Sequence, residues 1–76
     1  MDCRLDLRGV RCPMNYIKTK LKLEGLAAGQ VLEVFIDEGE ALETIPFALR
    51  AEGHEILVSE PLQNGVRLLV KKRNPP

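Results

Sequence analysis

The chain has 76 residues, which is short for one domain and excludes two independent hydrophobic cores. It has no net charge, few aromatic residues and abundant aliphatic residues, a composition that excludes a disordered chain and predicts a small sheet with helices packed on it. We therefore expect a single domain over residues 1–76.

The charge is unevenly distributed along the chain. Basic residues dominate up to Lys22, acidic residues dominate from Glu33 to Glu60, and the chain closes on a basic segment, Lys71 to Arg73. Direct nucleic-acid binding is not favoured, because the net charge is zero and no aromatic residues alternate with the basic ones.

The beginning of the chain, MDCRLDLR, lacks the apolar stretch of a signal peptide, and the longest apolar run, VLEVFI, is too short to span a bilayer. We expect a cytoplasmic protein with no membrane partner. Cys3 and Cys12 flank a segment whose extended form would hold them too far apart for a disulfide, so we expect free thiols. The sequence contains no CxxC pair and no His/Cys cluster, so we expect neither a zinc site nor a cofactor.

The first predicted elements are a strand and a helix. The segment CRLDL alternates apolar and polar residues, as a short strand does, and Gly9 ends it. A helix is predicted over residues 13–24, because proline favours the first helical position and Gly25 is a typical stop. Its apolar stripe is predicted to consist of Met14, Ile17 and Leu21, with Lys18 and Lys22 on another face.

A central strand and a second helix follow. The nearly continuous apolar run VLEVFID is typical of a strand covered on both faces or nearly so. The next segment, EGEALETIPFALRAEG, reads as a helix that Gly53 terminates. It should start near Leu42 or Glu43, so that Pro46 falls in the first turn, where its missing N–H costs nothing. Four acidic residues lie near this start: Asp37, Glu38, Glu40 and Glu43. We interpret them first as favourable charges at the positive end of the helix dipole, second as a docking surface, and only distantly as a cation site, because the spacing of a calcium loop is missing.

The last two predicted elements, HEILVSE and VRLLVKK, form a hairpin, because Asn64-Gly65 is a strong tight-turn signal. The order is β-α-β-α-β-β. We predict an α/β two-layer sandwich, of the α+β type, in which a four-stranded mixed sheet carries both helices on one face, as right-handed crossovers require.

Cys12 is the candidate reactive residue. It directly precedes Pro13, which would place it at the N-cap of the first helix, where unpaired backbone N–H groups and the dipole favour a thiolate. The basic residues of this part of the chain are by default a solvated surface. The functional alternative is that Arg8, Arg11 and Lys18 surround the sulfur and steer an acidic partner surface toward it. The alternative is that Cys12 is a small buried hydrophobic residue, which is the common fate of a free cysteine and the role that we expect for Cys3.

No general base accompanies Cys12. His54 is the only histidine, and we expect a surface or half-buried structural role for it at the start of a strand. Cysteine-protease chemistry therefore has little support. The chemistry that remains needs only a nucleophilic sulfur, which attacks a sulfur donor, holds a persulfide and passes it on.

Three stretches resemble the TusA/SirA/YedF family of small sulfur-carrier proteins, and together they extend the resemblance over about residues 4 to 73. They are D-L-R-G-x-x-C-P at Asp6 to Pro13, which includes Gly9, L-x-x-G-x-x-L-x-V at Leu26 to Val34, and Ile45-Pro46 preceding Gly53-His54. One position departs from the family pattern C-P-x-P, because Asn15 stands where the second proline is usual.

The resemblance implies a four-stranded mixed sheet under two helices and a persulfide on Cys12. It implies a cysteine desulfurase or a rhodanese-type protein as the sulfur donor and a downstream protein as the acceptor, without net turnover by the carrier alone. Asn15 restores a backbone donor and adds a polar side chain near Cys12, which bears on partner recognition. The alternatives are a non-catalytic interaction or regulatory domain of the same fold, and a thiol redox sensor, which the lack of a resolving cysteine near Cys12 disfavours.

Overall fold

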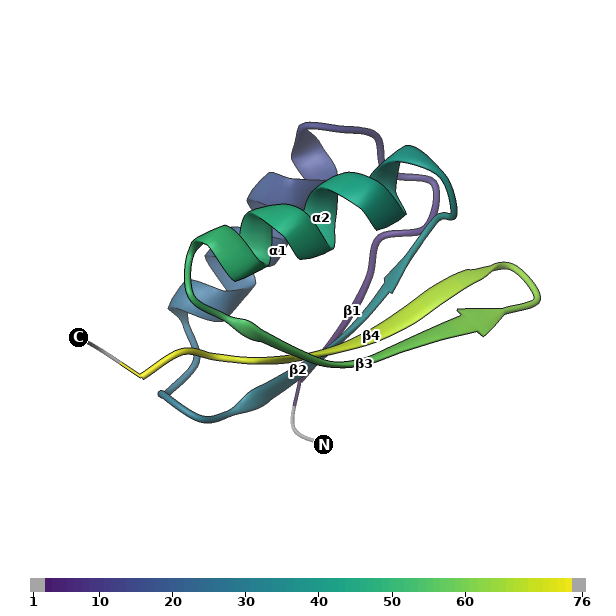
Figure 1. The fold of residues 1–76 in the computed structure, drawn as a ribbon. Helices are drawn as coiled ribbons and strands as arrows, with labels where there is room; N and C mark the ends of the chain where they lie inside the picture. Colours follow the sequence, from purple (N-terminus) through teal and green to yellow (C-terminus); the bar gives the residue numbers. More distant parts are fainter. Residues whose placement is uncertain (1–2, 75–76) are drawn as a thin grey trace.

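A computed structural model, which describes residues 3–74, shows a single sheet with a layer of two helices on one of its faces (Figure 1). The elements in chain order are β1 (Cys3–Asp6), α1 (Met14–Glu24), β2 (Val31–Ile36), α2 (Glu40–Ala51), β3 (Glu55–Leu62) and β4 (Gly65–Lys71). The predicted class and element order are confirmed.

The four strands are arranged in the order β1-β2-β4-β3. β1 pairs in parallel with β2, whereas β4 runs antiparallel to both β2 and β3, so the sheet is mixed. β2 lies in the interior of the sheet, as its apolar run predicted. Because β1 and β2 are parallel, the loops that follow them emerge at the same edge of the sheet.

The core lies between the sheet and the helices. Alternate residues of β2 and β4 point to the helices and are at most 3% exposed, namely Leu32, Val34, Ile36, Val66, Leu68 and Val70. Helix α2 contributes Ala41, Ile45 and Leu49, spaced one helical turn apart. The opposite face of the sheet carries no helix (Figure 1).

The apolar stripe predicted for α1 faces solvent, not the core. Met14, Ile17 and Leu21 are between 39% and 62% exposed, whereas the buried positions are Asn15, Thr19 and Leu23. Thr19 can be buried because its hydroxyl donates to the Asn15 carbonyl at 2.9 Å. Such local hydrogen bonds satisfy polar side chains inside the core, and hydrophobic periodicity alone does not detect them.

Helix α2 starts earlier than the position near Leu42 or Glu43 that we predicted from Pro46. It begins at Glu40 after Gly39, so Pro46 lies in its interior and not in its first turn. An interior proline costs about 3 kcal/mol, because it cannot donate to the carbonyl four residues before it. The longer helix places Ala41 one turn before the fully buried Ile45, and Pro46 is itself buried, so packing against the sheet compensates for this cost.

The hairpin turn is shifted by one residue from the predicted pair. Gln63 and Asn64 form the turn, and Gly65 already belongs to β4, with φ +127°. Asn64 does not have a positive φ. Pro61 lies in β3, an edge strand, where a missing N–H is tolerated.

Candidate functional site

Cys12 is exposed at the end of the loop that connects β1 to α1. It was predicted at the N-cap of α1, but the structure places Pro13 there, with Cys12 one residue earlier. Regular helical bonding starts with the Ile17 N–H, which donates to the Pro13 carbonyl at 3.0 Å. In the preceding turn the Asn15 N–H donates to the Arg11 carbonyl at 3.1 Å, and Cys12 lies within this turn. A cis peptide bond joins Cys12 to Pro13.

The loop before Cys12 is tied to the neighbouring loop between β2 and α2. The Gly9 N–H donates to Asp37 Oδ2 at 2.8 Å, and the Leu7 N–H donates to the Phe35 carbonyl at 2.7 Å. Gly9 has φ +85°, a conformation that glycine adopts without strain. These contacts fix the position of the β1–α1 loop relative to the start of α2.

An open cavity of about 340 Å³ lies between these two loops. The first wall comes from the β1–α1 loop and the first turn of α1, with Val10, Arg11, Cys12 and Asn15. The second wall comes from the start of α2 and the loop before it, with Asp37, Glu38, Glu40 and Ala41. Cys12 therefore lines a cavity that two segments distant in sequence build together.

Only one of the three predicted cations lines this cavity, and it is Arg11. Arg8 instead makes a two-pronged ion pair with Asp6, with Nε–Oδ1 at 3.0 Å and Nη2–Oδ2 at 2.8 Å. These hydrogen bonds lower the pKa of Asp6 to about 2 and raise the pKa of Arg8. Lys18 is exposed on α1 and is not part of the cavity wall.

The acidic wall of the cavity was not predicted as part of the site. The sequence indicates favourable helix-start charges at Asp37, Glu38 and Glu40 first, and a docking surface second. Glu40 does fill the first role, in the first turn of α2. These acidic residues lie beside Cys12 because β1 and β2 pair in parallel, which brings the loops after both strands to one sheet edge.

Asn15 and Pro13 shape the start of α1. Asn15 is 2% exposed, and its side-chain Oδ1 accepts the Tyr16 N–H at 2.6 Å. Helix starts carry unpaired N–H groups, and this contact satisfies one of them without a capping side chain at Pro13. Met14, next in sequence to Pro13, begins the exposed apolar stripe of α1.

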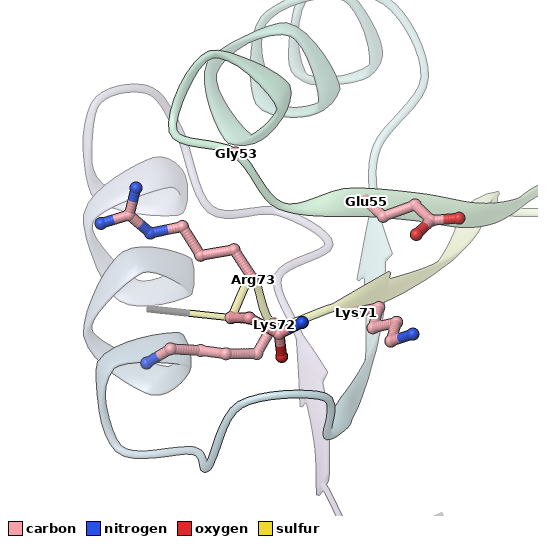
Figure 2. Close-up of a pocket in the computed structure, with 6 residues that line it drawn as sticks. Gly53, Glu55, Lys71, Lys72 and Arg73 are labelled. Atoms are coloured by element: carbon pink, nitrogen blue, oxygen red, sulfur yellow. The ribbon is translucent and has the colours of Figure 1, made fainter. Parts of the chain in front are cut away.

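Two further hollows lie at the other end of the helices, of about 370 and 240 Å³. Both are lined by Lys72 and Arg73, which extend toward α1, whereas Glu55 and Lys71 point away from it (Figure 2). Lys72 Nζ donates to the Leu23 carbonyl at 2.6 Å and so caps the C-terminal end of α1. The Arg73 N–H donates to His54 Nδ1 at 3.1 Å, a structural contact of the kind expected for this histidine.

Comparison with known proteins assigns the chain to a family. Residues 4–72 match the family described as "Sulfurtransferase TusA". The chain belongs to the TusA family. A TusA-family role as a sulfur carrier or sulfurtransferase is supported by this match and by the names of the relatives below.

The TusA-like relatives cover most of the chain. One from Archaeoglobus fulgidus, named "Putative sulfur carrier protein", is 41% identical over 70 residues, which are 91% of this chain and 80% of the relative. A relative from Methanocaldococcus jannaschii with the same description is 36% identical over 69 residues, which are 91% and 92% of the two chains. The fold matches that of a SirA-like protein from Desulfitobacterium hafniense, with a TM-score of 0.77, 23% identity and coverage of 96% and 99%.

Residues 3–74 contain neither a membrane-spanning helix nor a cluster of metal-ligating side chains. None of the helices in this range is long and apolar enough to cross a membrane. Likewise, no group of three or more His, Cys, Asp or Glu side chains in this part of the chain converges as metal ligands do.

Proposed function

We propose that Cys12 carries sulfur as a persulfide and relays it from a donor protein to an acceptor protein in the cytoplasm. The observation that carries the proposal is the exposed Cys12 sulfur in a cavity of a TusA-family chain. Cys3 lacks this setting, because it is half-buried in β1 and packs against the core. Cys12 is therefore the thiol that a partner protein can reach.

The proposed loading step is a thiol exchange on a persulfide. The Cys12 thiolate attacks the outer sulfur of a persulfide on the donor's cysteine, and a new S–S bond forms at Cys12 as the donor's S–S bond breaks. The electron pair of the broken bond leaves with the donor's cysteine as a thiolate. Unloading onto an acceptor cysteine repeats the exchange in the other direction, so no oxidant or reductant is consumed.

The donor class that fits is a cysteine desulfurase or a rhodanese-type protein, because both present a persulfide on a cysteine. The exposed stripe of α1 supports a protein as partner. Met14, Ile17 and Leu21 form an apolar surface that starts two residues after Cys12 and faces away from the sheet. Arg11 and the acidic wall provide polar contacts around the sulfur.

The first prediction concerns sulfur loading. Incubation with a cysteine desulfurase and cysteine is expected to add the mass of one sulfur atom to the protein, as measured by intact mass spectrometry. Cys12→Ser should abolish this addition. Cys3→Ser is the matched control and should be loaded like the wild type, because Cys3 lies on the core side of β1.

A wild-type protein that gains no sulfur from a desulfurase or from a rhodanese-type donor would overturn the proposal. The second candidate function is a non-catalytic interaction domain, which the same apolar stripe favours. For that function Cys12→Ala should leave partner binding intact, whereas Leu21→Ala should weaken it.

A further inference from the structure

Asn15 has side-chain hydrogen-bond donors that no group in residues 3–74 accepts. Its Oδ1 accepts the Tyr16 N–H, which fixes the orientation of the carboxamide, because only an oxygen can accept that hydrogen. The side-chain NH2 group has no acceptor among residues 3–74, although Asn15 is 2% exposed. Among residues 3–74 the only buried side-chain polar atom without a partner is Glu52 Oε2, so the Asn15 NH2 group reaches solvent. Because Asn15 lines the cavity, this donor is available to a group bound there.

The unpaired donors lie at the cavity that holds the Cys12 sulfur. Asn15 and Cys12 belong to the same cavity wall, and the turn from the Arg11 carbonyl to the Asn15 N–H encloses Cys12. Asn15 follows Cys12 by three residues, across the start of α1. A persulfide extends the cysteine by one S–S bond of about 2.05 Å, and its outer sulfur lies at the cavity that Cys12 lines.

The charges around the cavity create a need for such a donor. Three carboxylates, those of Asp37, Glu38 and Glu40, face a sulfur anion across the cavity, and Arg11 is the cation in its wall. One oxygen of Asp37 is already engaged by the Gly9 N–H. A hydrogen-bond donor that contacts the persulfide directly offsets the repulsion between its anionic sulfur and these carboxylates.

We propose that the side-chain NH2 of Asn15 donates a hydrogen bond to the outer sulfur of a persulfide on Cys12. The inference rests on the proposed function and adds a positioning residue to it. The contact stabilises the anionic form of the persulfide and holds the outer sulfur in a defined direction for the acceptor. A proline at position 15 lacks both this donor and the backbone N–H that bonds the Arg11 carbonyl.

The test compares the lifetime of the persulfide in variants loaded by a cysteine desulfurase. Asn15→Asp keeps an oxygen for the Tyr16 N–H and removes the NH2 group, while Asn15→Pro removes the NH2 group without adding charge. Each is expected to lose its sulfur to a small thiol roughly tenfold faster than the wild type, since hydrogen bonds to charged groups are the strong ones. Lys18→Ala is the matched control on the same helix and should behave like the wild type, because Lys18 is outside the cavity.

Each outcome decides between the alternatives. If Asn15→Asp and Asn15→Pro release sulfur at the wild-type rate, the inference is wrong and the proposed function stands. If only Asn15→Asp is faster, the added carboxylate is the cause and the inference is also wrong. If the wild type acquires no sulfur, the proposed function itself fails. Thermal unfolding of each variant shows whether it is folded, and Asn15→Ala replaces Asn15→Pro if the proline variant is not.

Discussion

Gly65 shows how strongly a single residue is constrained in this fold. It is buried at the first position of β4 and has φ +127°, which side chains rarely adopt. A Cβ atom at this position would lie 2.5 Å from the Ile36 carbonyl oxygen and 3.2 Å from Arg8 Cδ. The hairpin therefore approaches the end of β2 so closely that only glycine fits.

We expect Gly65→Ala to lower the free energy of unfolding by more than about 2 kcal/mol, since it combines backbone strain with a backbone clash. Gly29→Ala is the matched control, because Gly29 has φ +84° but open space where a Cβ atom would lie, so it isolates the backbone strain. Urea unfolding of both variants measures the difference. Equal losses of stability would show that the close approach to Ile36 contributes nothing.

Arg8 shows where proximity in sequence misled the prediction. It was expected beside Cys12, but its guanidinium lies 5.3 Å from the Phe35 ring centroid, as part of an ion pair with Asp6. Arg4 also lies over Phe35, at 5.7 Å. Arg4, Asp6 and Arg8 follow one another at intervals of two residues. The alternation of a strand, continued through position 8, would have predicted this common face.

At the scale of elements, α1 carries a leucine on each of two faces that differ in burial. Leu23 is 1% exposed and packs in the core, whereas Leu21 is 62% exposed. Leu23→Ala is expected to cost about 2–5 kcal/mol of stability, because it leaves a cavity in the core. Leu21→Ala should change stability by less than about 0.5 kcal/mol.

The same pair of variants separates folding from partner contact. If the outward face of α1 contacts a donor, Leu21→Ala should slow sulfur transfer from a desulfurase while leaving the thermal unfolding temperature unchanged. Chemical denaturation and intact mass spectrometry measure the two effects. A Leu21→Ala protein that is unstable, or one that is loaded at the wild-type rate, would contradict this assignment of the outward face.

Sequence patterns predicted the elements better than their faces and limits. The type and order of all six elements followed from periodicity, glycine stops and turn residues, which are local signals. The outward face of α1 could not be predicted from these local signals, because the burial of Asn15 and Thr19 depends on hydrogen bonds that form only in the folded chain. The start of α2 could not be predicted either, since the packing of Ala41 and Ile45 outweighs the tendency of Pro46 to occupy the first turn of a helix.

At the scale of the whole molecule, a row of ion pairs crosses the sheet on the face without helices. Glu33 in β2 accepts from Arg4 at 2.8 Å on one side and from Arg67 on the other, and Arg67 also contacts Glu60 at 3.5 Å. Hydrogen bonds from Arg67 and then from Arg4 hold the pKa of Glu33 below its ordinary value. The row connects all four strands and explains how a carboxylate is nearly buried in a central strand.

The two ends of the helix layer differ in chemistry. Cys12 and Asn15 meet the start of α2 at one end, whereas Glu24 and His54 share a hollow at the other. The helices therefore run side by side in the same direction. Cys12 could be identified as the candidate residue from its local sequence, but the acidic wall around it depends on the parallel pairing of β1 with β2, a contact between distant segments.

His54, at the end of the helix layer opposite Cys12, makes the stability of the fold depend on pH. Burial lowers the pKa of His54, Lys72 and Arg73 act in the same direction, and Glu52 opposes them. Neutral His54 is the form whose Nδ1 accepts the Arg73 N–H. Because the folded-state pKa lies below the ordinary value of 6.5, the unfolded chain takes up this proton first, so the stabilisation is complete above that value and is lost as the pH falls below it.

We therefore expect the free energy of unfolding to decrease between about pH 7.5 and pH 5.5, by less than about 1 kcal/mol, because solvent screens a partly exposed group. His54→Asn should remove most of this decrease, since its side-chain oxygen can replace Nδ1 as the acceptor and does not titrate. Urea unfolding at several pH values measures the slope, and an unchanged slope in His54→Asn would assign the effect to another group. Sulfur loading of Cys12 should be the same in both proteins, because His54 lies at the far end of the helices.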